Sequence, residues 1–307
     1  MFKTPTLFLI TNCSATKRVA SGEPVHLRNW SGSVRQRFRW WRQAIDREND
    51  LTPARDCYAG DAWTQVVAAE KASSGECQLW VVSAGLGLIS SDLPIPNYSA
   101  TFISNDPDSV GPSHQARTEW WELICDWRRK ISGVGSITDL AEANPNSVFL
   151  IALSSSYLAV IKDDLLSARL ALESPDNLII ISAGTRAMPE MGSSLLPIDA
   201  RFENLVGGAR ATLNARMLRY LVENFDLRKF NACKIRKSLN ITATELAKPK
   251  LFDRARLDDV GIAAFIHKQS KLVRKTSAST LLRILRDGGS ACEQKRFHRI
   301  YKTIHST

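Results

Sequence analysis

The chain has 307 residues, which is enough for one large or two modest domains with a proper hydrophobic core. Apolar residues make up 44% and charged residues 23%, a balance that is typical of globular proteins and argues against a disordered chain. The apolar runs fall far short of the ~18 residues that span a bilayer, and no signal-peptide pattern opens the chain. We therefore expect a cytoplasmic protein.

The net charge of +10 is concentrated at one end of the chain. Residues 228–307 include 19 basic and 6 acidic residues, whereas the first 227 residues include 22 basic and 25 acidic ones. This asymmetry predicts a basic module attached to a near-neutral one, with a polyanion as partner. The alternative is a solvated basic surface without a partner.

The six cysteines and five histidines are scattered, and no CxxC pair occurs. Structural zinc needs close-set ligand pairs, and a disulfide scaffold needs a short, cysteine-dense chain. We therefore expect reduced cysteines, no metal site and no cofactor.

Four short apolar runs predict strands that are buried on both faces of a parallel sheet, at 6–11, 79–83, 148–153 and 178–182. Between and after these runs lie segments whose apolar residues have helical spacing. These predicted helices are at about 34–45, 61–73, 113–130, 157–172 and 210–224. The alternation predicts a three-layer α/β domain with a mostly parallel sheet over residues 1–228.

Each predicted strand ends in small or polar residues. The four endings are Asn12-Cys13-Ser14, Ser83-Ala84-Gly85, Ser154-Ser155-Ser156 and Ser182-Ala183-Gly184. Because ligands of open α/β sheets bind beyond the carboxyl ends of the strands, we expect a polar crevice there. The alternative is that these residues only open tight turns.

The basic tail, residues 240–307, has a helical pattern. Thr242-x-x-Glu245 and Ser290-x-x-Glu293 have capping-box spacing, and another predicted helix, about 278–286, ends at Gly288-Gly289. This order fits a small helix-turn-helix or winged-helix-like domain that binds DNA. The candidate phosphate contacts in the tail are Lys268, Arg274, Lys275, Lys295, Arg296 and Arg299.

Several spaced motifs carry a family resemblance. They are Asn12-Cys13-Ser14-x-x-Lys17, the segment 54–61 (ARDCYAGD), the segment 80–88 (WVVSAGLGL) with Asp92-x-x-Ile95-Pro96-Asn97-Tyr98, and Gly207-Gly208 before a leucine-rich helix. Over roughly residues 6–105 and 205–222 the chain resembles a family of short bacterial and phage α/β proteins with the uracil-DNA-glycosylase type of fold. An insertion at 28–51 and the basic tail depart from the family pattern.

The resemblance implies an enzyme that acts on nucleic acid. One branch of the family consists of antiviral DNA glycosylases that excise glucosylated hydroxymethylcytosine from phage DNA. The implied activity is hydrolysis of an N-glycosidic bond after base flipping, and the implied partner is double-stranded phage DNA with modified bases.

Base excision passes through an oxocarbenium-like transition state, which needs a positioned water and a carboxylate or amide. Asn12 is the candidate for orienting the water, and Asp56 is the candidate carboxylate; a helix cap or an ion pair is the alternative role for Asp56. Tyr58 and Tyr98 are candidates for stacking on a flipped base, and Ser83 for bonding its edge. The remaining base-pocket candidates are Ser14, Lys17, Gly85 and Asp92.

The insertion interleaves arginines with aromatic residues, a pattern typical of surfaces that contact phosphates and unpaired bases. Phe38 and Trp41 share a helical stripe with Val34 and Ile45, so we interpret them as core. The candidate DNA contacts in the insertion are Trp30, Arg35, Arg37, Arg39, Trp40 and Arg42.

Two other functions stay open. The first is a base-exchanging transglycosylase on DNA or tRNA, with Asp56 or Asp92 as the nucleophile. The second is a non-catalytic DNA-binding regulator whose α/β domain senses a nucleotide.

Overall fold

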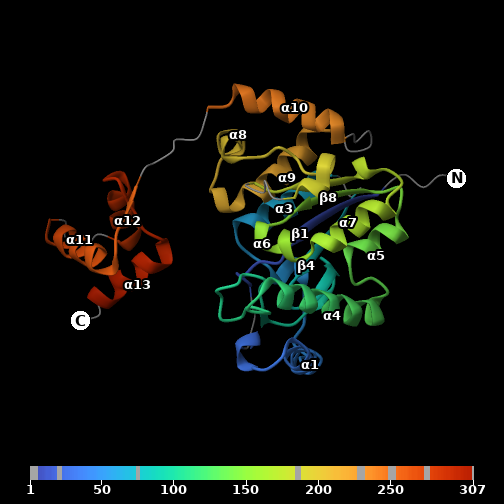
Figure 1. The fold of residues 1–307 in the computed structure, drawn as a ribbon, viewed down its shortest axis with the longest axis horizontal. Coiled ribbons are helices and arrows are strands. Elements are labelled where there is room, and N and C mark those ends of the chain that lie inside the picture. The colour runs from blue at the N-terminus through green and yellow to red at the C-terminus, as the bar shows by residue number, and fades with distance from the viewer. Residues whose placement is uncertain are drawn as a thin grey trace. The chain divides into compact units, whose positions relative to one another are not determined.

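The computed structural model describes residues 6–18, 23–73, 77–183, 188–226, 232–247, 254–272 and 277–305. The chain divides into two compact units, Met1–Lys248 and Pro249–Thr307, and each is described by itself (Figure 1). Among the described residues, no helix combines the length and the apolar character that crossing a membrane requires.

The first unit is built on a five-stranded sheet. Its strands are β1 (Leu7–Asn12), β4 (Cys77–Ser83), β5 (Gly87–Ser90), β8 (Val148–Ala152) and β9 (Leu178–Ile181). Their order is β5-β4-β1-β8-β9; the β4–β5 pair is antiparallel and the other three pairs are parallel. The four strands expected from apolar runs are confirmed, and the fold is α/β with a mixed, mostly parallel sheet.

The centre of the sheet is buried on both faces. All five residues of β8 and the first five of β1 are buried. Because successive side chains of a strand point to opposite faces, helices or loops must cover both sides of these strands. This explains why both strands are uninterrupted apolar runs in the sequence.

Helices account for much of the rest of this unit. They are α1 (Val34–Ile45), α2 (Ala54–Cys57), α3 (Asp61–Ala72), α4 (His114–Ser132), α5 (Ile137–Ala143), α6 (Ser155–Val160), α7 (Lys162–Ala171), α8 (Glu203–Val206), α9 (Leu213–Asn224) and α10 (Ala232–Glu245). Short 3-10 turns lie at Leu27–Asn29, Pro175–Asn177, Pro189–Ser194, Ala200–Phe202 and Arg210–Thr212. α3 packs on α9, α5 on α7, and α1 on α4 (Figure 1).

Two small strand pairs lie outside the main sheet. β2 (Val25–His26) pairs with β7 (Tyr98–Ser99), and β3 (Thr52–Pro53) pairs with β6 (Pro94–Ile95). These pairs join the segments around residues 25 and 52 to residues 94–99, which follow β5.

The expected helices are present with local differences. α1 begins at a capping box in which Ser33 and Gln36 bond reciprocally. The helix expected over 157–172 is instead two helices, because the backbone leaves the helical region at Ile161. The helix expected over 210–224 opens with a 3-10 turn before α9.

The helix start expected at Thr242 is wrong, since this residue lies in the last turn of α10. Its Oγ1 donates to the carbonyl oxygen of Ser238 (3.1 Å) instead of capping a helix N-terminus. α10 buries Ile235 and Leu239 in the core of the first unit, so the second unit begins after this helix.

The second unit has its own small core. Its described elements are α11 (Asp259–Leu272), α12 (Ala278–Asp287), α13 (Gln294–His305) and a parallel pair of β10 (Ala255–Arg256) with β11 (Ser290–Ala291). The core residues are Ile262, Ile266, Leu281, Leu282, Leu285, Cys292 and Phe297. α12 ends at Gly288 as expected, but Ser290 lies in β11, so the capping box expected there is wrong.

Candidate active site

The strand order reverses at β1. The chain passes from β1 to β4 and β5 on one side, and β8 and β9 then lie on the other side. Neighbouring strands β1 and β8 therefore flank a topological switch point, where open α/β sheets bind their ligands.

A cavity of about 530 Å³ lies at this point. Its lining comes from residues 11–17 after β1, from Ala152, Ser154 and Tyr157 after β8, from residues 99–106, and from residues 211–215 at the start of α9. The expected crevice is thus confirmed at two of the four strand ends. Of the base-pocket candidates, Ser14 and Lys17 line it, together with the catalytic candidate Asn12.

Lys17 is held firmly in the cavity wall. Its backbone forms a bridge with Tyr58, and its Nζ donates to the carbonyl oxygen of Tyr98 at 2.5 Å. The ammonium group also lies 4.2 Å from the centre of the Tyr98 ring, which is within cation–π range. Burial lowers the pKa of Lys17, although the nearby Cys13, Cys57 and Asp108 act in the opposite direction.

Asp106 is the one acidic residue among the described residues that line the cavity. Its Oδ1 accepts a hydrogen bond from the backbone N–H of Asp108 (2.9 Å), which fixes the carboxylate on its loop. No sequence motif includes Asp106. Its place in the cavity lining and its hydrogen bond with Asp108 are seen only in the folded chain.

Asp108 anchors that loop from within. Its buried carboxylate accepts hydrogen bonds from the backbone N–H and Nε of Arg28 (both 2.9 Å) and from Ser99 Oγ (2.7 Å), and it contacts His26 Nδ1 at 3.1 Å. Burial alone would raise the pKa of Asp108. The hydrogen bonds, led by those of Arg28, outweigh burial and hold that pKa well below its usual range.

Two asparagines join the strand ends around the cavity. Asn12 Oδ1 accepts the N–H of Ser154 after β8 (3.1 Å), and its Nδ2 donates to the Cys13 carbonyl oxygen (3.1 Å). Asn214, from α9, accepts the N–H of Ala183 (2.8 Å) and donates to the carbonyl oxygen of Leu153 (2.7 Å). The Asn12 amide is therefore engaged by the backbone, which assigns it a positioning role in this structure.

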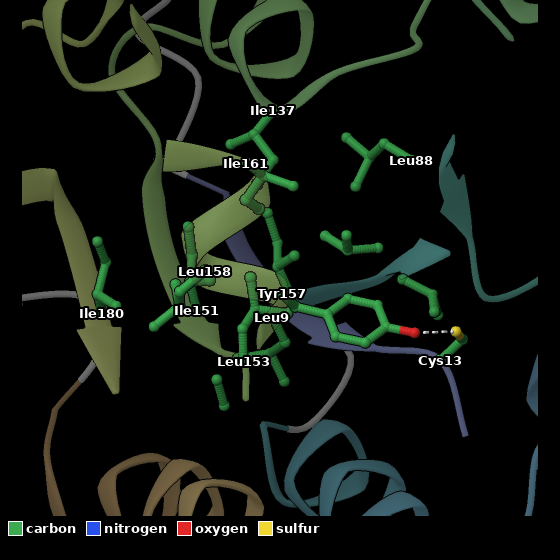
Figure 2. Packing of buried hydrophobic residues seen from close by; sticks show 14 of the residues in the cluster. Leu9, Cys13, Leu88, Ile137, Ile151, Leu153, Tyr157, Leu158, Ile161 and Ile180 are labelled. Atoms are coloured by element: carbon green, nitrogen blue, oxygen red, sulfur yellow. Dashed lines mark hydrogen bonds between the residues drawn. The ribbon is translucent and has the colours of Figure 1, made fainter. Parts of the chain in front are cut away.

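Cys13 and Tyr157 form a buried pair in the cavity wall. Figure 2 shows the Tyr157 ring pointing from α6 toward Cys13 among the labelled aliphatic side chains. The Cys13 Sγ lies 3.1 Å from the Tyr157 hydroxyl. Burial raises the pKa of Tyr157 well above its ordinary value, so its hydroxyl stays protonated at neutral pH.

The expectation that Tyr58 and Tyr98 stack on a base is not met in this structure. Both rings are fully buried and neither lines the cavity. Their hydroxyls lie 2.6 Å apart, and the Tyr98 hydroxyl lies 2.6 Å from Ser83 Oγ. A Cβ on Gly85 would come within 2.6 Å of the Tyr98 ring, so Gly85 allows this close packing. These four residues form a polar network beneath the site.

The two candidate carboxylates lie away from the cavity lining. Asp56 is exposed on α2. Asp92 is exposed as well, and Arg55 Nε lies 2.6 Å from its Oδ1. The structure therefore does not bring either residue together with Asn12, Ser14 and Lys17.

The arginine-aromatic insertion is partly core and partly surface. Phe38 and Trp41 are buried, as interpreted from the sequence, and Trp30 packs edge-on against Trp41 with ring centres 6.0 Å apart. Trp40 is 41% exposed. Arg37 points inward, where its guanidinium donates to three backbone carbonyls, those of Trp30, Ser109 and Val110.

The remaining arginines of α1 face outward. Arg35 pairs with Glu119 (2.9 Å), whereas Arg39 and Arg42 are exposed, with no ion pair to another described residue. Trp40, Arg39 and Arg42 are thus each exposed on α1, but Trp40 lies at i+1 and i−2 from the two arginines and so on a different side of the helix.

In the second unit, Lys268 is exposed on α11, and Lys295 lies on α13. Arg274 and Lys275 lie outside the described residues. Arg296 is engaged within the unit: its Nε donates to Asp259 Oδ1 (2.6 Å), and its NH1 to the Leu257 carbonyl oxygen (3.1 Å).

Arg299 approaches the same Asp259 carboxylate at 3.4 Å and is otherwise exposed. Part of the basic face of α13 is thus neutralised by one aspartate of its own unit.

No arrangement of three or more His, Cys, Asp or Glu residues suited to a metal ion occurs in the described part of the chain. Comparison with known proteins identifies no relative, since no family model, curated protein or solved structure matches this chain. The family resemblance noted in the sequence therefore stays a prediction.

Proposed function

We propose that this protein is a DNA glycosylase that hydrolyses the N-glycosidic bond of a modified base, most specifically a modified cytosine of phage DNA, in antiviral defence. The observation that carries the proposal is the switch-point cavity, which gathers a carboxylate, an amine and several hydroxyl groups. Its volume of about 530 Å³ lies within the ~300–1,000 Å³ range of small-molecule sites, so it suits one flipped nucleoside.

Asp106 takes the role of the catalytic carboxylate in this proposal. A carboxylate beside the sugar activates water and stabilises the positive charge that develops as the bond to the base breaks. The backbone N–H of Asp108 donates a hydrogen bond to Oδ1 of Asp106. In the proposal, the other carboxylate oxygen, Oδ2, contacts the water or the sugar. Ser14 and Ser154 supply hydroxyl groups for the edge of the base.

The proposal assigns DNA-backbone contacts to the second unit. Residues 249–307 include 13 basic and five acidic residues, and neutralising phosphates with such residues is the main source of DNA affinity. The order α12, Gly288-Gly289, α13 supports a helix-turn-helix or winged-helix-like module. The exposed Arg39 and Arg42, three residues apart on α1, offer further phosphate contacts. The strand order with its switch-point cavity supports the uracil-DNA-glycosylase type of fold for the first unit.

The test is release of free base. Phage DNAs that carry different cytosine modifications are incubated with the protein, and released bases are identified by mass spectrometry. Asp106→Asn should abolish release while DNA binding is retained. Asp56→Asn is the matched control, because Asp56 is an exposed carboxylate outside the cavity lining.

Failure to release a base from any of these DNAs, with binding intact, would overturn the proposal. Loss of activity in Asp56→Asn but not in Asp106→Asn would reassign the carboxylate. Incorporation of a labelled free base, instead of release, would identify base exchange.

A further inference from the structure

We propose that Lys17 is a Schiff-base nucleophile, which gives this cavity a second activity: cleavage of DNA strands at abasic sites. The substrate is the ring-opened sugar of an abasic site, an aldehyde at C1′. The choice of substrate rests on the proposed glycosylase function, because excision of a base produces that sugar in the same cavity.

The first support is the fixed position of the amine. Residues 16–18 form an antiparallel bridge with the segment around Tyr58, made by two backbone hydrogen bonds: the Ala59 N–H donates to the Thr16 carbonyl oxygen (3.0 Å), and the Arg18 N–H donates to the Cys57 carbonyl oxygen (2.7 Å). The segment after β1 is therefore pinned on both sides of Lys17. Lys17 lines the cavity, and its Nζ is hydrogen-bonded to the Tyr98 carbonyl oxygen, from which a side-chain rotation would bring it to a ligand there.

The second support is the set of partners around Nζ. Within the described part of the chain, the amine has one hydrogen-bond acceptor, the Tyr98 carbonyl oxygen, and no carboxylate forms an ion pair with it. An ammonium group has three donors, so part of its bonding capacity faces no protein acceptor. Lys17 is partly buried and lines the cavity.

The third support is reactivity. Imine formation needs the neutral amine, and burial lowers the pKa of Lys17. The fraction of neutral amine at pH 7 is thus larger than for an exposed lysine. The carboxylate of Asp106 lines the same cavity and serves as the proton acceptor.

The chemistry balances without a further reactant. The Nζ lone pair forms a bond to C1′; the aldehyde oxygen takes one proton from the amine and one from the solvent and leaves as water, which gives a protonated imine. Asp106 takes a proton from C2′, the C–H electron pair forms the C1′–C2′ double bond of an enamine, and the C3′–O3′ bond then breaks with departure of the phosphate. Water hydrolyses the remaining imine, which restores the Lys17 amine and releases an unsaturated aldehyde.

Reductive trapping tests the proposal independently of base excision. A duplex with a preformed abasic site is mixed with the full-length protein and sodium borohydride, which reduces an imine to a stable amine. Wild-type protein should form a covalent DNA adduct, and mass spectrometry of its peptides should place the adduct on Lys17. Because this mapping uses the wild type, it does not depend on whether a variant folds.

Variants test whether Lys17 is the residue that forms the imine. Lys17→Gln and Lys17→Arg should each lower the trapping yield by about tenfold or more, since neither side chain forms an imine. Lys130→Gln is the matched control, because Lys130 is exposed on α4, and its yield should equal that of the wild type. Asp106→Asn should still be trapped but should not cleave the strand.

The proposal is overturned if the adduct maps to another lysine, or if the adduct yield of the wild type does not exceed that of Lys17→Gln. The outcome is separable from that of the glycosylase test. Release of free base without trapping would refute the lyase alone, whereas trapping on preformed abasic DNA without release of any base would refute the glycosylase alone.

Discussion

Replacement of Asp108 by asparagine should destabilise the first unit and loosen the loop that carries Asp106. The variant keeps the side-chain volume but replaces one acceptor oxygen with an amide NH2, which then faces the donors of Arg28, Ser99 or His26. A hydrogen bond to a charged group contributes about 1.5–3 kcal/mol, and such contributions are not additive. We expect a loss of about 2–4 kcal/mol in the free energy of unfolding.

For a unit of this size, each kcal/mol lowers the melting temperature by about 2–4 °C. The expected decrease for Asp108→Asn is therefore about 4–16 °C, measured by circular dichroism at pH 7. Asp56→Asn is the control, since an exposed carboxylate without a buried network should change stability by no more than about 0.5 kcal/mol.

The pH dependence gives a second signature. The pKa of Asp108 is lower in the folded state than the ~3.9 of an unfolded aspartate, so its stabilising contribution is complete above pH ~4 and is lost as the pH falls toward the folded pKa. Asparagine does not titrate. The stability difference between wild type and variant should therefore be constant from pH 7 to 5 and should shrink below pH ~4, as measured by urea unfolding. A difference below about 0.5 kcal/mol at pH 7, or one that persists unchanged at pH 3, would refute the reasoning.

Three further predictions follow from close contacts. Gly85→Ala should cost about 1–3 kcal/mol of stability, because the new Cβ would lie 2.6 Å from the buried Tyr98 ring; an unchanged melting temperature would contradict this. Asn214→Ala should cost about 1–3 kcal/mol in urea unfolding, because it leaves one backbone N–H and one carbonyl without their partner. Asp259→Asn should free Arg296, raise duplex-DNA affinity and steepen its salt dependence by up to about 0.9 in log–log slope; an affinity equal to wild type would show that Arg296 does not contact DNA.

Strands and most helices were predictable because their signals are local. The run Val148–Ala152 is apolar at every position, as expected for a strand buried on both faces, and it forms β8. The capping boxes at Thr242 and Ser290 failed for the opposite reason. A serine or threonine three residues before a glutamate caps a helix only where a helix begins. Thr242 lies in the last turn of α10, and Ser290 lies in β11, so that α13 begins four residues later, at Gln294.

The candidate site was predictable at the ends of β1 and β8, and not elsewhere. Ser14 and Lys17 line the cavity because they directly follow a central strand at the switch point, a relation that the sequence pattern contains. Asp106 and Asn214 come from a loop and from α9, and only the folded chain brings them to the same cavity. The motif at 54–61 made Asp56 the candidate catalytic carboxylate. In the structure its neighbours Cys57 and Tyr58 are buried, whereas Asp56 is exposed.

The Gly207-Gly208 motif has a packing explanation. Gly208 has φ of +77°, and a Cβ there would lie 2.2 Å from Nε of Arg216. Arg216, from α9, pairs with Asp61 at the start of α3 (2.8 Å). The glycine therefore permits an ion pair that joins α3 and α9.

The cavity is assembled from segments that are far apart in sequence, and each has its own anchor. Lys17 is held by the strand-like contacts to Tyr58, the Asp106 loop by the Asp108 carboxylate, and α9 by the Asn214 amide. In the proposed reaction, a site anchored in this way is preorganised, so Asp106 and Lys17 would need little rearrangement when substrate binds. It follows that damage to an anchor should lower turnover by misplacing an intact reacting group, whereas Asp106→Asn removes the group itself. The two kinds of loss are separable, because only the anchor variants should lose stability and activity together.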